Sequence, residues 1–423
     1  MKLLTLIYII PFVICAQLKV GAKAEYNKAK LVVMHQPDYE LYYGVVHPHA
    51  ALFDTYFDRT LAKVEHQNFQ NLLSKKNIDI LTVQQILLKN TLDKNNQAKP
   101  GKSLLELQKF ARTCIEIDTV SKSYLGLKEY KQQQEYLDDV FSKMHPYDLI
   151  KTILLQPSIT LKRTNTNTYT SADYKVRPVM NLYFSRDQMI TTPKGIVLSS
   201  LNSVQRSVET KILKFCLQKL DIPTLLDLSE EKYKNCFLEG GDYFSFGNTS
   251  LIGQGMRTNR EAIKELMKQD VFGTKYVAIV KDSYFYQPQM HLDTYFNVID
   301  SDLVTVSKKR YMTNVKESKA PVVDLFVKRN KEYVLEKKDL TFKKYLSKYL
   351  KAKVLVISDE DQENYGLNFL CIGPREIVAV RGQSAAYISM MKKHNVKINW
   401  VDFTNLKQGW GAAHCTTQVI IRE

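Results

Sequence analysis

The sequence has few cysteines for its length, and they lack the spacing with which cysteines usually bind metal or exchange electrons. Six cysteines are spread over 423 residues, and no two form a CxxC pair. This spacing argues against zinc ribbons and dithiol redox sites. The acidic and histidine motifs described below also lack metal-ligand spacing. We therefore expect neither a metal ion nor a cofactor.

The basic residues likewise lack the arrangement that is typical of nucleic-acid binding. The net charge is +16, yet the lysines are scattered, without a long basic block or an arginine–aromatic recognition motif. We interpret this charge as a lysine-rich, solvated surface and expect no nucleic-acid partner. The content of 44% hydrophobic and 25% charged residues is typical of a folded protein with a large core.

The N-terminal segment predicts a secretory signal peptide over residues 1–16. Lys2 gives a short positive region, Leu3 begins an apolar stretch, and Ala16 is a small residue suited to cleavage. The stretch is shorter than the roughly 20 residues of a membrane-spanning helix. We therefore expect secretion without stable membrane insertion, with a short signal anchor as the alternative. One glycosylation sequon, at Asn248, is compatible with this route.

The hydrophobic pattern predicts an α/β domain over residues 26–423, interrupted by a helical insertion over residues 83–155. A strand and then a helix over 51–73 open the domain, whereas the insertion has helical periodicity and almost no strand signal. Ser103 and Glu106 are typical of a capping box at the start of a helix in the insertion. Farther on, short β-rich runs alternate with helices, and the runs cover residues 276–280, 353–358, 377–380 and 397–403.

One cysteine near the C-terminus follows a run of small residues. Cys415 comes after Gly409, Gly411 and two alanines, and small residues permit the close approach that a nucleophile loop needs. A thiol with a pKa near ~8.5 needs a neighbouring cation or base to ionise at neutral pH. His414, directly before Cys415, is one candidate for this neighbouring cation or base. The alternative interpretation is a buried structural cysteine.

Three motifs upstream supply carboxylates and one histidine. They are NLYFSRD with Asp187, LEGGD with Glu239, and MHLDT with His291 and Asp293. If MHLDT is a strand, His291 and Asp293 face the same side, and the histidine can serve as general acid or base. Each motif also has a structural interpretation, as a surface ion pair, a turn or a buried His–Asp pair. A thiol surrounded by acids suits a planar cation, so the sequence predicts guanidine chemistry.

Together and in this order, the motifs resemble those of the arginine deiminases, within the guanidine-modifying or amidinotransferase superfamily. The match includes NLYFSRD, LEGGD, GMRT at residues 255–258, MHLDT and the glycine-rich cysteine motif. The segment VMHQPDYE and the stretch LFDTYFDRTLAKVEHQNF also match the opening of the family. The resemblance extends from Lys30 to the end of the chain and includes the helical insertion.

The resemblance implies a five-bladed β/α propeller of pseudo-fivefold symmetry that hydrolyses L-arginine to citrulline and ammonia without metal or cofactor. It implies that Cys415 attacks the guanidinium carbon and forms a thiouronium intermediate. It further implies that His291, steered by Glu239, protonates ammonia and then activates water, while Asp187 and Asp293 bind the guanidinium nitrogens. We also expect a homo-oligomer. The residues implied to bind the amino-acid end of the substrate are Asn181, Phe184, Arg206 and Arg257.

The terminal motif departs from this family at Trp410, where arginine deiminases usually carry an arginine that helps to bind the substrate carboxylate. Loss of one charge-assisted contact of ~1.5–3 kcal/mol predicts roughly 10–150-fold weaker carboxylate binding, unless Arg206 and Arg257 compensate. The HCTTQ segment is more similar to agmatine deiminases and amidinotransferases. An agmatine or peptidyl-arginine deiminase is therefore an alternative, as is a non-catalytic guanidine-binding protein of the same fold. Arginine is favoured because the helical insertion and both arginines are retained.

Overall fold

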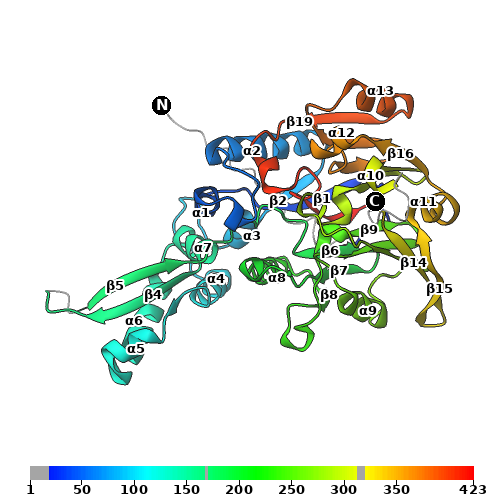
Figure 1. Ribbon diagram of the computed structural model, residues 1–423. Coiled ribbons are helices and arrows are strands. Elements are labelled where there is room, and N and C mark those ends of the chain that lie inside the picture. Colours follow the sequence, from blue (N-terminus) through cyan, green and yellow to red (C-terminus); the bar gives the residue numbers. More distant parts are fainter. Residues whose placement is uncertain (1–18, 167–169, 312–319) are drawn as a thin grey trace.

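The protein is an α/β fold built from six β-sheets with helices between them (Figure 1). The computed structural model describes residues 19–166, 170–311 and 320–423, so the predicted signal peptide lies outside the described residues. Across these described ranges, none of the helices combines the length and the apolar character that crossing a membrane requires.

Five of the six sheets repeat one pairing pattern. In each, a middle strand pairs antiparallel with one neighbour and parallel with the strand that comes after it along the chain. The sixth sheet differs, because the parallel neighbour of its middle strand comes before that strand along the chain. The five triplets, with the middle strand second, are β20 (Gln418–Arg422), β1 (Ala29–Met34) and β2 (Asp79–Thr82); β6 (Met189–Thr192), β7 (Gly195–Leu198) and β8 (Thr224–Asp227); β9 (Tyr243–Phe246), β10 (Thr249–Gln254) and β11 (Tyr276–Lys281); β12 (Phe296–Asp300), β13 (Leu303–Ser307) and β16 (Lys353–Ile357); and β17 (Leu370–Gly373), β18 (Glu376–Val380) and β19 (Lys397–Val401). The first triplet pairs the N-terminal and C-terminal strands of the described chain.

Helices connect the two parallel strands of the triplets, because parallel neighbours need a crossover. Four triplets use a helix of nine residues or more: α2 (Arg59–Lys75), α8 (Glu209–Lys219), α9 (Arg260–Lys268) and α13 (Ala385–Lys393). The remaining crossover contains α10 (Lys308–Tyr311), α11 (Phe342–Lys344), the π-helix η9 (Tyr345–Leu350) and two strands, β14 (Val322–Arg329) and β15 (Glu332–Thr341), which extend the sheet of β11. The other short helices of this body are α1 (Glu40–Val46) and α12 (Asp359–Glu363).

The described residues of the segment 83–176, which follows β2, form a lobe that projects from one side of this body (Figure 1). Its helices are α3 (Val83–Leu88), α4 (Lys102–Arg112), α5 (Val120–Leu125), α6 (Leu127–Lys143) and α7 (Pro146–Leu155). Its small sheet consists of β3 (Glu116–Ile117), β4 (Pro157–Arg163) and β5 (Thr170–Val176). The strands β4 and β5 form a long antiparallel hairpin beyond the helices.

The four predicted β-rich runs are confirmed as β11, β16, β18 and β19. The predicted helix over 51–73 begins only at Arg59, because the Asp58 carboxylate accepts hydrogen bonds from Thr60 N at 2.7 Å and Leu61 N at 3.0 Å. The predicted capping box is wrong. Helix α4 already begins at Lys102, and its N-cap, Gly101, has no side chain to accept a bond.

Candidate active site

The predicted nucleophile lies in a buried turn directly before β20. Cys415 Sγ accepts a hydrogen bond from Asn368 Nδ2 at 3.2 Å, and its S–H donates to Asp293 Oδ2 at 3.3 Å. A Cβ on Gly411 would lie 2.8 Å from Cys415 Cβ and 2.6 Å from the Phe184 ring. Only glycine fits there, so the small residues of the motif do allow a close approach to the thiol.

The surroundings of Cys415 favour its neutral form while the cavity is empty. Burial raises the pKa of the thiol well above its usual range, and the negative charges of Asp293 and Asp187 raise it further. The hydrogen bond from Asn368 acts in the opposite direction. A positively charged ligand beside the sulfur would offset the two carboxylates, so ionisation of this thiol depends on what binds next to it.

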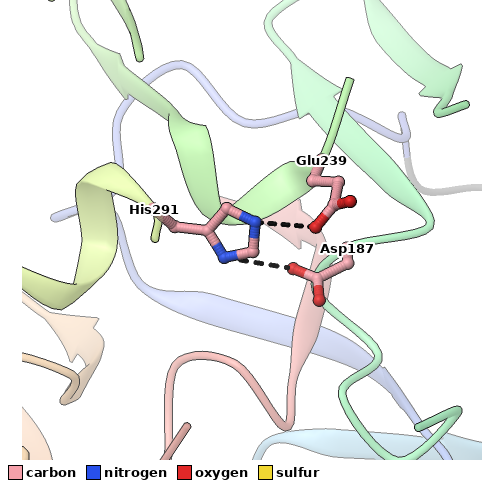
Figure 2. A group of neighbouring side chains, drawn as sticks. All are labelled: Asp187, Glu239 and His291. Carbon is pink, nitrogen blue, oxygen red and sulfur yellow. Dashed lines mark hydrogen bonds and ion pairs between the residues drawn. The ribbon is translucent and has the colours of Figure 1, made fainter. Parts of the chain in front are cut away.

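His291 lies between two carboxylates at the cavity. Its Nε2 is 2.8 Å from Glu239 Oε2 and its Nδ1 is 3.9 Å from Asp187 Oδ1 (Figure 2). A Cβ on Gly241 would come within 2.8 Å of the ring, so LEGGD leaves the imidazole its space. Burial lowers the pKa of His291, but Asp187 and the bond to Glu239 outweigh it and raise the pKa to about 9. The ring therefore holds a proton at neutral pH and can donate it to a departing group.

Glu239 stays ionised although it is fully buried. Burial alone would raise the pKa of its carboxyl, but the hydrogen bond from His291 and the charge of Arg257 lower it to about 2. Its Oε1 accepts from Asn202 N at 3.2 Å and lies 3.7 Å from Arg257 Nη1. This fixed anion keeps the His291 ring in place and keeps it charged.

Asp187 and Asp293 each present one oxygen that is held and one that has no hydrogen-bond partner among the described residues. Asp187 Oδ2 accepts from Arg206 Nη1 at 2.7 Å, and Asp293 Oδ2 accepts from His414 Nδ1 at 2.7 Å. The Oδ1 atoms of both are buried and accept no hydrogen bond within the described ranges, although Asp187 Oδ1 lies 3.9 Å from His291 Nδ1. Burial raises the pKa of Asp293, but the hydrogen bond from His414 outweighs it and lowers the pKa. An unpaired buried carboxylate oxygen is costly, and a ligand N–H would satisfy it.

The expectation that His291 and Asp293 lie on one strand is wrong. His291 is the N-cap of a short 3-10 turn, η7 (Leu292–Thr294), and Asp293 lies within that turn. Leu292 N donates to Asp242 Oδ1 at 2.9 Å, and Thr294 Oγ1 donates to His291 O at 2.6 Å. These bonds point the two side chains at different partners, Glu239 and His414 respectively.

The four residues expected at the amino-acid end of a substrate all line the same cavity. The cavity lining consists of Leu52, Asn181, Phe184, Asp187, Arg206, Arg257, Gln287, Met290, His291, Gly409, Trp410 and Cys415. It encloses about 20 Å³ of water-accessible space, room for about one water molecule. Entry of a larger ligand therefore requires lining side chains to move.

Both cavity arginines are already paired with acids. Arg206 is buried and donates to Asp187 and, through Nε and Nη2, to Glu209 at 3.1 and 2.8 Å. Arg257 faces Glu239 and donates from Nη2 to Gln287 Oε1 at 3.3 Å, but its buried Nε has no partner among the described residues. A ligand carboxylate therefore has to share these arginines with protein carboxylates.

Trp410 forms part of the cavity wall rather than turning away from it. Its backbone adopts the left-handed conformation, with φ of 69°, which is uncommon for a bulky residue. Trp410, where the sequence departs from the pattern that it resembles, thus lines the same cavity as the thiol and the two arginines.

The sequence motifs did not point to Asn368, which holds the nucleophile. Its Nδ2 donates to Cys415 Sγ, while its Oδ1 accepts from Ala412 N at 2.8 Å and Cys415 N at 3.3 Å. Asn368 precedes β17 in an ordinary apolar segment, and nothing local distinguishes it from a buried structural asparagine.

Asp187, Glu239 and His291 are the residues best placed to hold a metal ion. Each offers one ligand atom, and the three atoms lie within 4.8 Å of one another. A metal ion would have to displace the proton that His291 holds with a pKa of about 9. The acid–base geometry described above needs no such ion.

The sequence matches proteins of one known family. The sequence model described as arginine deiminase matches residues 49–422. The arginine deiminase of Halobacterium salinarum is 23% identical, over 96% of this chain and 97% of that protein. The arginine deiminase of Treponema denticola is 25% identical, over 96% and 98%.

Solved structures with a similar fold belong to related enzymes. An amidinotransferase of Microseira wollei gives a TM-score of 0.55 at 12% identity, covering 96% of this chain and 97% of that one. A dimethylarginine dimethylaminohydrolase of Pseudomonas aeruginosa, complexed with citrulline, gives a TM-score of 0.52 at 12% identity, covering 92% and 98%. At this identity the likeness extends to the fold alone.

Proposed function

Because this chain belongs to the arginine deiminase family, we propose that it hydrolyses L-arginine to L-citrulline and ammonia with Cys415 as the nucleophile. One observation carries the proposal. A buried thiol and a protonated histidine line a single cavity beside a carboxylate oxygen that has no partner among the described residues. Binding alone would need neither the thiol nor the histidine, whereas displacement at a guanidinium carbon needs both.

In the first half of the reaction, the guanidinium N–H groups donate to Asp187 Oδ1 and Asp293 Oδ1, the two unpartnered oxygens. The neighbouring carboxylates disfavour the Cys415 thiolate, and the positive charge of the substrate stabilises it. The thiol therefore gives its proton to solvent as the substrate binds, and it regains a proton when the product leaves. The sulfur attacks the guanidinium carbon. His291 then gives its proton to the departing nitrogen, the C–N bond breaks, and ammonia leaves behind a thiouronium bonded to Cys415.

In the second half, neutral His291 takes a proton from a water molecule that adds to the thiouronium carbon. The C–S bond breaks, the sulfur leaves as thiolate, and the hydroxyl proton passes to solvent, where ammonia takes it up. Glu239, with a pKa of about 2, stays ionised throughout and holds the ring in both protonation states.

Arginine is the favoured substrate because Arg206 and Arg257 both face the cavity, together with Asn181 and Phe184. Trp410 favours a different candidate, because an aromatic ring cannot pair with a carboxylate but can cover the alkyl chain or the ammonium of agmatine. Agmatine and peptidyl-arginine, which lack a free α-carboxylate, therefore form the second candidate substrate class.

Formation of a ureido product and ammonia tests the proposal, with the purified chain lacking residues 1–16 and with L-arginine, agmatine and a blocked arginine peptide as substrates. We expect turnover of arginine, lost in Cys415→Ala and retained in Cys216→Ala. Cys216 is a matched control, since it is a buried thiol of α8 whose pKa burial raises to about 12. Turnover of agmatine or peptide alone would make Trp410 the specificity determinant. No turnover of any substrate would favour a guanidine-binding protein.

The proposal includes an arrangement of the five triplets as a pseudo-fivefold propeller. The repeated pairing pattern supports it, since each triplet has the same order of antiparallel and parallel neighbours. We further propose a homo-oligomer that enters the secretory pathway through residues 1–16, with a signal anchor as the alternative. Light scattering of the purified enzyme and N-terminal sequencing of the mature chain test these points.

A further inference from the structure

A second group of buried charges extends from Asp293, next to Cys415, into the protein outside the cavity lining. We call it the rear cluster, and it consists of Asp293, His414, Glu25, Arg186 and Arg422, all of them buried. None except Asp293 has a part in the reaction described above, and none lines the cavity. Buried ion pairs often stabilise a fold no better than apolar residues of similar size, so this cluster calls for another explanation.

His414 is the centre of the rear cluster. Its Nδ1 is 2.7 Å from Asp293 Oδ2 and its Nε2 is 3.6 Å from Glu25 Oε1. The ring stacks on Phe244, with centroids 5.2 Å apart and an interplanar angle of 17°. A carboxylate therefore faces each ring nitrogen. An imidazolium attracts both carboxylates, whereas a neutral ring hydrogen-bonds Asp293 alone, because Nε2 has no hydrogen-bond partner among the described residues.

Glu25 anchors this ring from the N-terminal segment ahead of β1. Its carboxylate binds Arg422 of β20 and lies 3.9 Å from Arg186 Nη2. Arg186 also donates from Nε to His414 O at 3.3 Å, and its backbone N donates to Cys415 O at 3.1 Å. The two ends of the described chain thus meet behind the nucleophile and fix the residue before it.

The charge of the rear cluster depends on His414. Two carboxylates and two guanidiniums cancel, so the cluster is neutral with a neutral ring and positive with an imidazolium. The thiol connects to this cluster through Asp293 Oδ2, which both His414 Nδ1 and Cys415 Sγ contact. A positive charge one residue away offsets the carboxylate beside the sulfur. The titratable and charged groups around the thiol and this ring are Asp187, Asp293, Glu25, Arg186, Arg422, Tyr183 and Tyr365.

We propose that His414 is a positioning residue for the nucleophile: it fixes Asp293 against Cys415 and, held by Glu25 as an imidazolium, supplies positive charge that stabilises the thiolate. The effects of this residue on kcat that are expected below rest on the proposed function. The reactivity of the thiol toward an alkylating reagent does not require turnover, so failure of the two proposals can be told apart.

The test compares two substitutions of His414 in the full mature chain. In His414→Asn the amide takes the place of Nδ1 and keeps the bond to Asp293, whereas in His414→Gln the amide takes the place of Nε2 and loses that bond. We expect kcat for arginine to fall ~3–10-fold in the first and ~30–100-fold in the second, with KM changed less than about threefold. A space-filling role predicts the reverse order, because glutamine matches the length of histidine better.

The second readout is the rate at which iodoacetamide alkylates Cys415 between pH 6 and 9, followed by mass spectrometry. Both variants lose the positive charge, so we expect alkylation ~3–10-fold slower than in the parent. A merely structural role predicts faster alkylation, because a loosened site exposes the thiol. The control is His66→Gln, since His66 is a buried histidine of α2 that contacts Gln70 at 2.9 Å.

Two results would overturn the proposal. One is a greater loss of kcat in His414→Asn than in His414→Gln, and the other is unchanged or faster alkylation in both variants. If neither variant folds, nitrogen-15 spectra of histidine-labelled parent enzyme decide the matter. The proposal requires both ring nitrogens of His414 to carry protons at pH 7, and a neutral ring would contradict it.

Discussion

Two histidines flank the catalytic thiol, and each lies between two carboxylates. His291 has Glu239 at 2.8 Å and Asp187 at 3.9 Å, and His414 has Asp293 at 2.7 Å and Glu25 at 3.6 Å. The near and far distances are almost the same in the two groups. The two rings differ in whether a ligand can reach them, because His291 lines the cavity and His414 is completely buried.

Because of this difference in access, the two histidines have different roles although their carboxylate partners are alike. A proton on His291 can pass to a ligand nitrogen or be taken from a water molecule, so that ring can act as acid and base. A proton on His414 has only the two carboxylates to go to, so that ring acts through its fixed charge and its hydrogen bond. The position of a histidine relative to the cavity decides its role here, more than the type of its partners.

The largest effect is expected when His291, the proton carrier that lines the cavity, is replaced. In His291→Asn we expect kcat to fall by ~10²–10⁴, because a general acid and base contributes about that much. The effect should exceed that of His414→Asn by at least about tenfold. Citrulline release under saturating arginine measures both. A larger loss in His414→Asn than in His291→Asn would mean that the roles are exchanged.

Much of the fold could be predicted from local sequence. The runs that became β11, β16, β18 and β19 are short apolar segments between turn signals, and helix α7 begins at Pro146 and ends before Pro157. The pairing of β1 with β20 could not be predicted, because strands so far apart in sequence carry no local sign of their register. The start of α4 was missed because Gly101, which has no side chain, takes the N-cap.

The candidate site divides in the same way. Motifs that contain glycine, histidine or cysteine could be found in the sequence. The structure places Cys415 and His291 in the lining of one cavity, with Glu239 bonded to His291. Asn368 and Glu25 could not be found, because each is a single polar residue in an ordinary segment whose role depends on a contact far away in sequence. The MHLDT turn was mistaken for a strand because the bond from Leu292 to Asp242 decides it.

A second test weakens substrate binding on the cavity side alone. Asp187→Asn removes one charge-assisted bond to the guanidinium, worth ~1.5–3 kcal/mol, so we expect kcat/KM for arginine to fall roughly 10–150-fold. Steady-state kinetics measure it. The control is Asp324→Asn, which removes a buried carboxylate that pairs with Lys281 at 2.6 Å away from the cavity. Equal losses in the two variants would mean that Asp187 acts only through stability.

A third test measures whether a positive charge on a reagent in the cavity speeds the alkylation of Cys415. 2-Chloroacetamidine is cationic and 2-chloroacetamide is its neutral counterpart. We expect the amidine to alkylate Cys415 about tenfold faster or more, after correction for their rates with a free thiol, because its charge offsets Asp187 and Asp293.

Variants locate this preference for the cationic reagent. It should shrink in Asp187→Asn, which removes a carboxylate at the cavity. It should persist in His414→Asn, because His414 does not line the cavity that holds the reagent. A preference that vanished in His414→Asn would place the recognition of the cation behind the thiol instead.

The smallest effect we expect is on the free energy of unfolding, which should depend on pH through the charge of His291. His291 has its pKa raised to about 9 in the folded protein from ~6.5 in the unfolded chain. Its contribution is therefore fully present below pH 6.5 and declines as pH rises toward 9. Between pH 6.5 and 7.5, below the range where the cysteines of the unfolded chain titrate, we expect the free energy of unfolding to fall by about 1 kcal/mol. Urea denaturation at several pH values measures this, and His291→Asn should remove most of the decline. If the variant kept the same slope as the parent, the charge on His291 would not be linked to folding, and its place as the ionised partner of Glu239 would be lost.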